Sequence, residues 1–236
     1  MSYFLNEYYD QENDRIIISA AQGSQFAKVV ANDFNPIHNV DSRRFCVPGD
    51  LLFAIALQRY GLHQTMQFSF QELVKADTSL IYPISQSDQK IVLNHRDKTV
   101  LGIELAGRSL DDLGQIEQLI RKYVAFSGHN FPHILVPLMK QHQVMINPQR
   151  PLVIYEKMSL HFDELEFKQL NIELTKTNFT VNGKRGDAEL HFVINDNDKT
   201  IGSGIKSLVL SGLREYEQAS IDEMCALYEY YSNQGN

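Results

Sequence analysis

The spacing of apolar residues predicts alternating helices and strands in the first half of the chain. Residues 23–31 have a helical pattern that places Phe26, Val29 and Val30 on one face. Residues 51–60 are almost entirely apolar, which predicts a helix that is buried on all sides rather than an amphipathic one. Strand-like runs follow at 66–74, 79–83, 90–94 and 99–106.

The second half has the same order of elements. Residues 113–126 are predicted to be helical, and a turn with a short helix occupies residues 127–142. Predicted strands follow near 154–162, 169–175, 188–194 and 202–211. A last helix is indicated by Ser220 and Glu223, which have the spacing of a capping box. Its expected apolar stripe comprises Ile221, Met224, Cys225 and Tyr228.

The two halves also resemble each other in sequence. The segment M-Q-F-S-F-Q-E-L begins at Met66, and M-S-L-H-F-D-E-L begins at Met158. They share Met, Phe, Glu and Leu at matching positions, and both alternate apolar with other residues as a half-buried strand does. The shared order of matches indicates an internal duplication of a unit of roughly 100 residues, the size of one small domain.

Composition and charge narrow the class of protein. The 236 residues are 43% hydrophobic and 22% charged, with a net charge of −7 and scattered basic residues, so no nucleic-acid partner is expected. No apolar run approaches the ~20 residues that span a bilayer, and the segment from Met1 to Asn13 lacks the pattern of a signal peptide, so no membrane association is expected. Cys46 and Cys225 do not suggest a disulfide scaffold, which favours a cytoplasmic location.

The strongest candidate for chemistry is the segment Asp33-Phe34-Asn35-Pro36-Ile37-His38. Proline excludes a regular helix there, and a turn lets Asp33 and His38 point into one pocket. A carboxylate and an imidazole that share one water can take its proton, because histidine titrates near neutrality. Asn35 either fixes the loop or binds that water. Gly49 begins the apolar helix, where its backbone N–H is well placed for an oxygen that gains negative charge.

This segment resembles the D-x-N-P-x-H signature of the (R)-specific enoyl-CoA hydratases, the MaoC-like branch of the hot-dog fold superfamily. The resemblance covers mainly residues 26–57. It implies an α+β double hot-dog, in which two curved antiparallel sheets each wrap around a central helix and lie side by side with the sheets continuous. With the repeat, it implies an N-terminal unit at 1–108 and a degenerate C-terminal unit at 109–236 that ends in a helix.

The same resemblance implies an activity. The chain would add water to a trans-2-enoyl thioester to give the (R)-3-hydroxyacyl product, with Asp33, His38, Asn35 and Gly49 as the catalytic residues. The substrate carrier would be coenzyme A or acyl carrier protein, and neither a metal nor a redox cofactor is expected. A homodimer of double hot-dog chains is the assembly that this interpretation leaves open.

The chain departs from the hydratase pattern around the glycine. The hydratases commonly have histidine before it, whereas this chain has Pro48, with Val47 nearby. Pro48-Gly49-x-Leu looks more like the dehydratases of fatty-acid synthesis, but Ala54 stands where those enzymes have a glutamate. Asp50, in the first turn of the helix, is expected to complement the helix dipole.

The second half carries an incomplete copy of the motif. Asn130 and His133 align with the amide and the imidazole, but Gly128 stands at the position of the carboxylate. A second site is therefore expected to be inactive. His129 and His133 also have a spacing that can suit a metal, although Pro132 interrupts a helix there and no third ligand is evident.

Each candidate residue also has a structural interpretation. Asp33 and Asn35 can cap a turn, and His38 can be a buried, hydrogen-bonded histidine. Arg43-Arg44 can meet coenzyme A phosphates or lie in solvent. Two functions therefore stand beside the hydratase: a thioesterase on the same fold, with a carboxylate-activated water, and an inactive acyl-CoA-binding or regulatory protein.

Overall fold

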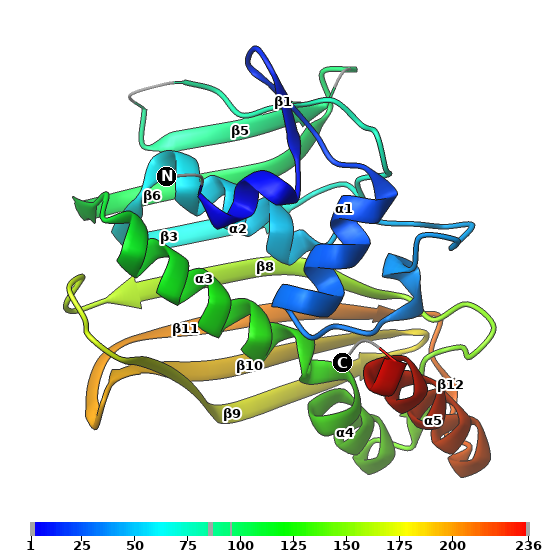
Figure 1. Ribbon diagram of the computed structural model, residues 1–236. Helices are drawn as coiled ribbons and strands as arrows, with labels where there is room; N and C mark the ends of the chain where they lie inside the picture. The colour runs from blue at the N-terminus through cyan, green and yellow to red at the C-terminus, as the bar shows by residue number, and fades with distance from the viewer. Residues whose placement is uncertain (1–2, 85–86, 95, 235–236) are drawn as a thin grey trace.

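The computed structural model describes residues 3–84, 87–94 and 96–234 (Figure 1). Its α-helices are α1 (Ala20–Gln25), α2 (Gly49–Tyr60), α3 (Leu113–Gly128), α4 (Val136–Gln141) and α5 (Gln218–Gln234). Short 3-10 helices are η1 (Phe4–Glu7) and η3 (Pro36–His38), and π-helical turns are η2 (Phe26–Val30) and η4 (Phe131–Leu135). Among the described helices, none combines the length and the apolar character needed to cross a membrane.

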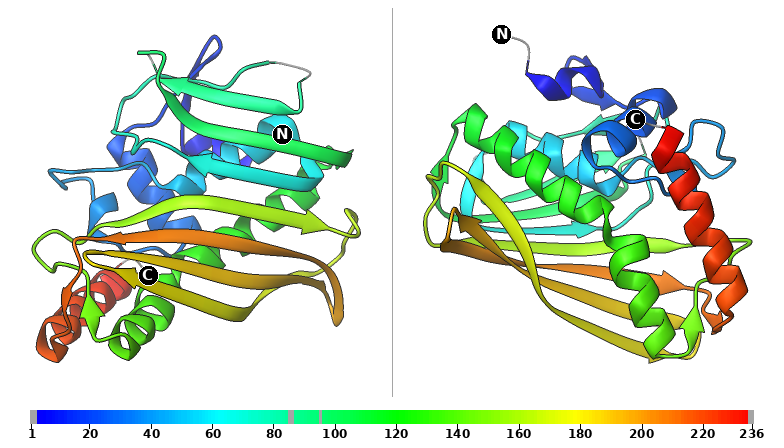
Figure 2. Two further views of the ribbon diagram at one scale, coloured as in Figure 1. Left: turned by 180° about the vertical axis from the view of Figure 1, so that it is seen from behind. Right: turned by 60° about the horizontal axis from the view of Figure 1, so that its bottom comes forward.

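Most strands belong to one large antiparallel sheet, so the chain is an α+β protein. The first-half strands are β1 (Asp10–Glu12), β2 (Arg15–Ile17), β3 (Leu62–Phe70), β4 (Leu80–Ile81), β5 (Gln89–Asn94) and β6 (Thr99–Leu110). The others are β7 (Val144–Met145), β8 (Val153–Phe162), β9 (Leu170–Asn182), β10 (Arg185–Asp196), β11 (Lys199–Ser211) and β12 (Arg214–Glu215). The order in the sheet is β1-β2-β4-β5-β6-β3-β8-β11-β10-β9, and β12 pairs with β7 separately. Figure 2 shows the curved sheet from behind, in front of the helices that it packs against.

The sheet has the same strand order on both sides of its centre. The strands β3 to β6 lie in the order β4-β5-β6-β3, and the strands β8 to β11 lie in the order β9-β10-β11-β8. The two repeat strands, β3 and β8, are antiparallel partners, with Met66 opposite Leu160 and Phe68 opposite Met158. The topology therefore repeats where the sequence does.

The expected continuity of the two sheets is confirmed, and it makes them a single sheet. The facing edges of β3 and β8 hydrogen-bond to each other, which leaves one ten-stranded sheet rather than two. An open strand edge carries unpaired N–H and C=O groups, so joining the two edges satisfies both. The division of the chain at residues 108 and 109 stays a prediction.

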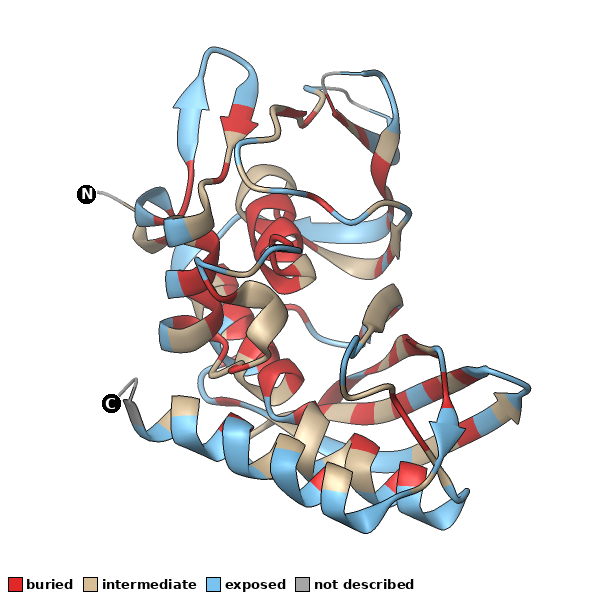
Figure 3. Ribbon diagram, turned by 90° about the vertical axis from the view of Figure 1, so that its right-hand side faces the viewer, coloured by how far each residue is buried: buried red, intermediate tan, exposed pale blue. Residues whose placement is uncertain are grey.

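Helix α2 is the centre of the core. Its residues from Asp50 to Leu57 are all buried, as the apolar run predicted (Figure 3). The Phe53 ring packs edge-on against Phe68 in β3 and against Tyr123 in α3, with ring centroids 5.0 Å apart in each pair. Residues of both halves therefore share this core. Gly61 ends the helix with φ +78°, a left-handed conformation that glycine adopts without strain.

Several predicted boundaries are wrong, among them the end of the strand expected at 169–175, which continues to Asn182 as β9. The strand expected at 66–74 begins and ends four residues earlier, because the chain leaves the sheet after Phe70 and lines the cavity described below. Helix α5 begins at Gln218, before Ser220, whose hydroxyl donates to Glu217 instead of capping the helix. The apolar stripe of this helix is confirmed, since Ile221 and Tyr228 are buried.

Candidate functional site

The Asp33–His38 segment folds as two consecutive side-chain-capped turns. The backbone N–H of Asn35 donates to Asp33 Oδ1 at 2.9 Å, and the N–H of Ile37 donates to Asn35 Oδ1 at 3.1 Å. Pro36 then begins η3, where its fixed φ suits a first helical position. Asn35 therefore fixes the loop through the oxygen of its side-chain amide, and Asp33 keeps its second carboxylate oxygen for other contacts.

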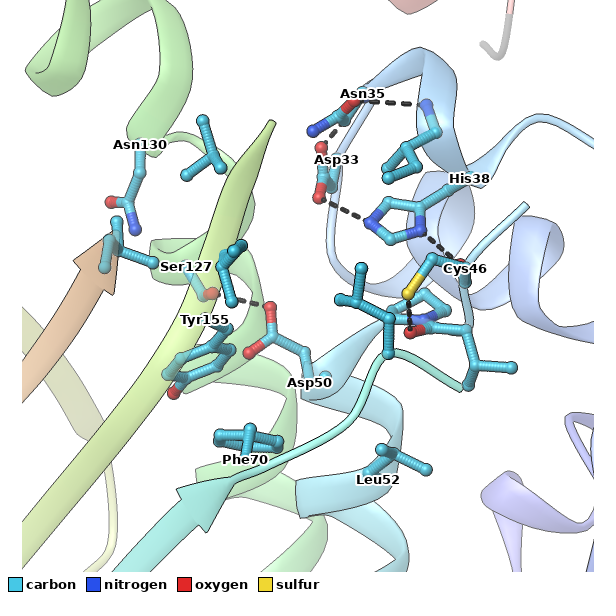
Figure 4. Close-up of a pocket in the computed structure, with 18 of the residues that line it drawn as sticks. Asp33, Asn35, His38, Cys46, Asp50, Leu52, Phe70, Ser127, Asn130 and Tyr155 are labelled. Atoms are coloured by element: carbon cyan, nitrogen blue, oxygen red, sulfur yellow. Dashed lines mark hydrogen bonds and ion pairs between the residues drawn. The ribbon is translucent and has the colours of Figure 1, made fainter. Parts of the chain in front are cut away.

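Hydrogen bonding fixes the tautomer of His38. Its Nδ1 lies 2.7 Å from the carbonyl oxygen of Cys46 and must donate, because a carbonyl only accepts. Nε2 faces Asp33 Oδ2 at 3.6 Å, a separation too long for a direct hydrogen bond (Figure 4). Both side chains are partly exposed to the cavity, at 12% for His38 and 22% for Asp33. The arrangement leaves a carboxylate oxygen and an imidazole nitrogen converging on the same small volume.

All four residues predicted as catalytic line one cavity of about 250 Å³. Asp33, Asn35, His38 and Gly49 form the wall that belongs to the first half of the chain. The opposite wall comes from the second half and comprises Ser127, Gly128, Asn130, Tyr155, Lys206 and Leu208. The site thus lies between the two repeats.

Gly49 occupies the first turn of α2, where helix geometry leaves N–H groups without an intrahelical acceptor. Aromatic rings pack closely against its Cα. A Cβ at this position would lie 3.0 Å from Tyr155 Cδ1 and 3.4 Å from Phe70 Cε1. The two rings stack on each other with centroids 4.4 Å apart and close one side of the cavity.

A buried polar network, missed by the sequence analysis, joins the two walls. Ser127 donates to Asp50 Oδ2 at 2.5 Å, and Lys206 Nζ donates to the same serine hydroxyl. Lys206 Nζ also lies 4.4 Å from the centre of the Tyr155 ring. Burial raises the pKa of Asp50 and lowers the pKa of Lys206, and each charge opposes the shift of the other. Asp50 therefore does more than complement the helix dipole.

Lys206 had a signal in the sequence. It alternates with Leu208 and Leu210 on the buried face of β11, so strand periodicity places a lysine among core residues. A buried lysine needs a partner, and that requirement marks the position. Ser127 had no comparable signal, because its contact with Asp50 depends on how α3 packs against α2.

Two residues of the incomplete second copy of the motif, Gly128 and Asn130, line the same cavity, whereas His133 is exposed and does not. Gly128 packs against the 31–32 backbone, where an added Cβ would come within 1.9 Å of the Ala31 oxygen, so no carboxylate fits there. Asn130 is 4% exposed and lines the cavity. Tyr228 of α5 binds this region together, with its hydroxyl 3.1 Å from the Asn32 carbonyl and 3.0 Å from that of Gly128.

The other residues singled out in the sequence are Cys46, the pair His129 and His133, and the pair Arg43 and Arg44. Burial raises the pKa of the Cys46 thiol to about 11, which suits a structural residue rather than a nucleophile. His129 and His133 have ring centroids 5.9 Å apart, and within the described ranges no third His, Cys, Asp or Glu joins them as a metal ligand. Arg43 and Arg44 are exposed.

A family model described as "Protein of unknown function (DUF3581)" matches residues 3–219 of the chain. The chain belongs to the DUF3581 family. No curated protein matches the sequence of this DUF3581 member.

Several solved structures are similar to this DUF3581 member at low identity. An acyl-CoA thioesterase II from Mycobacterium marinum is 10% identical, with 91% of this chain and 98% of that chain covered and a TM-score of 0.43. A hot-dog-fold protein of unknown function from Alicyclobacillus acidocaldarius is 8% identical, with 89% and 99% covered and a TM-score of 0.47. A MaoC-like dehydratase is 10% identical, with 88% and 99% covered and a TM-score of 0.41. These likenesses do not single out the hydratase branch.

Proposed function

We propose that the protein is an acyl-thioester hydratase, which adds water to a trans-2-enoyl thioester and forms the (R)-3-hydroxyacyl thioester. The observation that carries this proposal is the geometry of Asp33 and His38. Because Nδ1 of His38 is committed to the Cys46 carbonyl, Nε2 is the nitrogen that can accept a proton. It faces Asp33 Oδ2 at 3.6 Å inside a cavity that also contains Gly49.

A water bound to both Asp33 Oδ2 and His38 Nε2 is the proposed nucleophile. Its oxygen bonds to C3 of the enoyl group while the dyad takes its proton, and C2 receives a proton on the same face. The sum is one water added across one double bond. The carboxylate of Asp33 also stabilises the imidazolium that forms. Asn35 acts indirectly, by holding the loop that carries Asp33.

The thioester oxygen gains negative charge as water attacks. The N–H of Gly49 at the first turn of α2 is the proposed donor, since the N-terminus of a helix favours negative charge. The absence of a side chain at Gly49 lets the thioester approach the backbone beside Tyr155.

The test is a panel of trans-2-enoyl-CoA and saturated acyl-CoA thioesters, assayed for hydration and for free thiol. Wild type is expected to hydrate the enoyl thioesters and to leave the saturated ones intact. Asp33→Asn and His38→Gln should each lower kcat by about 100-fold or more. Asparagine retains the oxygen that accepts from the N–H of Asn35, so the turn and the melting temperature should be preserved.

Matched controls are available in the chain. Asp41→Asn and His133→Gln change exposed residues of the same types and should leave the rate unchanged. Strong destabilisation by both dyad variants would make the motif structural. Binding of acyl-CoA with neither reaction would make the protein a binding module.

Asp50 supports a second candidate, a thioesterase. Its Oδ1 is buried in the cavity wall without a hydrogen-bond partner among the described residues, and burial raises the pKa of the carboxyl group. A carboxylate in this setting can activate a water for attack at the thioester carbonyl carbon. Thiol release from saturated thioesters that is lost in Asp50→Asn and kept in His38→Gln would favour this function over hydration.

A further inference from the structure

The ten-stranded sheet ends in a long open edge. Strand β9 is last in the strand order and pairs with β10 on one side only; it lies at the lower margin of the sheet in Figure 1. It has 13 residues, whereas β1 at the opposite edge has three. Alternate N–H and C=O groups of an edge strand point away from the sheet, so β9 can pair with a further strand.

Other parts of the chain contact the two ends of β9 but not its middle. The backbone N–H of Leu170 donates to the side chain of Gln118 in α3 at 2.5 Å. Near the other end, the Phe179 ring packs edge-on against His142, which follows α4. The run Glu173-Leu174-Thr175-Lys176 between them is exposed, and within the described ranges its hydrogen bonds all go to β10. The middle of the edge is therefore open to a partner.

An irregular register puts two opposite charges of this run on one face of the sheet. The pairing of β9 with β10 skips Thr175. Glu173 lies opposite Val193. Lys176 lies opposite His191, two positions away on β10 and hence on the same face as Val193. In a regular strand, side chains three positions apart would point to opposite faces, so the extra residue is what brings Glu173 and Lys176 to the same side.

We infer that the β9 edge is the interface of a homodimer. Two copies of the chain pair their β9 strands antiparallel, with Glu173 opposite Lys176 of the partner subunit. The twofold axis passes between Leu174 and Thr175, so Lys176 in turn lies opposite Glu173 of the partner subunit. Residues opposite each other in an antiparallel pair must share a face, as these two do. The sheet then continues from one subunit into the other.

The charge pattern favours a second copy in one register. A lysine on an open edge ordinarily discourages pairing with another strand. In this register each Lys176 meets a carboxylate, and Leu174, which is 36% exposed in the single chain, meets Thr175 of the partner subunit. A slip by two residues in either direction loses both ion pairs, so the charges also specify the register.

Sedimentation velocity over a range of protein concentrations tests this interface, and wild type is expected to form a dimer. Glu173→Lys places lysines opposite each other at both pairs, and Lys176→Glu places glutamates there. Each variant should raise the dimer dissociation constant by about tenfold or more. The combined variant exchanges the two charges and should restore the wild-type constant. Lys157→Glu makes the same charge change on exposed β8 surface in the middle of the sheet and should leave the constant unchanged.

Hydrogen exchange shows whether the dimer forms through this edge. Amides of residues 173–176 that point away from β10 should exchange more slowly in the wild-type dimer than in the Glu173→Lys variant. A monomeric wild type, a dimer that both single variants leave intact, or a combined variant that stays monomeric would each overturn the inference. None of these measurements depends on the proposed hydration, because β9 does not line the cavity.

Discussion

Burial places Asp50 and Lys206 under opposite electrostatic constraints. Loss of hydration raises the pKa of the carboxyl group and lowers that of the ammonium group, while their mutual attraction favours the charged forms. Ser127 bridges the two through its hydroxyl. Removing one partner therefore leaves the other charge buried without compensation.

Lys206→Met is expected to lower the free energy of unfolding by about 3–5 kcal/mol at neutral pH. The folded variant holds the Asp50 proton more tightly than the unfolded chain, in which the carboxyl group titrates near 3.8. The contribution of Asp50 to stability is therefore fully present below pH 3.8 and is lost as the pH rises through the raised folded-state pKa. Urea unfolding at about pH 4.5 and about pH 8 measures this difference in unfolding free energy, because the two values span that window. Lys199→Met, an exposed lysine, is the control, and an equal loss at both values would contradict the prediction.

Gly49 is constrained by close packing rather than by its backbone conformation. Gly49→Ala improves helix propensity, but its Cβ would lie 3.0 Å from the Tyr155 ring. We expect the clash to dominate and to cost about 1–3 kcal/mol, with a higher KM as Tyr155 moves into the cavity. Gly114→Ala, in the exposed first turn of α3, should be neutral or stabilising in the same denaturation assay. If Gly49→Ala and Gly114→Ala changed the unfolding free energy equally, the Tyr155 ring would move aside without a loss of stability, which would contradict this prediction.

How well a site residue could be predicted depends on how far along the sequence its contact partners lie. Asp33, Asn35 and His38 are close in sequence, and their turn chemistry is local, so the motif alone predicted that they share a pocket. Ser127 and Lys206 reach Asp50 only through the packing of α3 and β11 against α2. No local pattern encodes that packing.

At the scale of elements, helix α2 was predicted well, whereas the end of β3 and the start of α5 were misplaced. The apolar run before Gly61 marked α2 well, because a left-handed glycine ends it. The end of β3 was misplaced because Leu73 and Val74 are apolar and were included in the strand, while the backbone after Phe70 leaves the sheet and lines the cavity. There the tertiary contact of Val47 N–H with the Val74 carbonyl overrides the strand pattern.

Helix α5 holds the motif loop to the second half through one side chain. The Tyr228 hydroxyl donates to the backbone carbonyls of Asn32 and Gly128. The Tyr228 ring packs edge-on against Phe34, with ring centroids 5.8 Å apart. Burial, reinforced by the nearby Asp33 charge, raises the pKa of Tyr228 to about 12. The hydroxyl therefore keeps its proton, and this contact, throughout the neutral range.

Tyr228→Phe removes that hydroxyl and keeps the ring. We expect a loss of about 1 kcal/mol in unfolding free energy and faster amide exchange at Asp33, whose N–H donates to the Ala27 carbonyl. Tyr230→Phe changes a ring that is 55% exposed on the same helix and should have no effect. Unchanged exchange at Asp33 in the Tyr228 variant would mean that α5 does not hold the loop.

At the scale of the whole molecule, the duplication predicted the repeated topology but not its consequence for cooperativity. The strands β3 and β8 join two copies into one sheet, and a single core cluster includes residues of both halves. Phe192 from β10 belongs to this shared cluster, whereas Phe179 from β9 belongs to a smaller cluster within the second half. Neither half can expose its part of the shared core without exposing that of the other.

The chain is therefore expected to unfold in one transition, although it consists of two repeats. Calorimetric and van't Hoff enthalpies should agree, and Phe192→Ala should lower the one melting temperature with a cost of about 3–5 kcal/mol. Phe179→Ala, at the rim of the smaller cluster and 9% exposed, should shift the same transition by less. Two resolved transitions, with Phe192→Ala moving only one of them, would mean that the halves fold independently despite their shared sheet. The cavity between them would then open whenever one half unfolds, so a ligand bound there would raise the lower transition first.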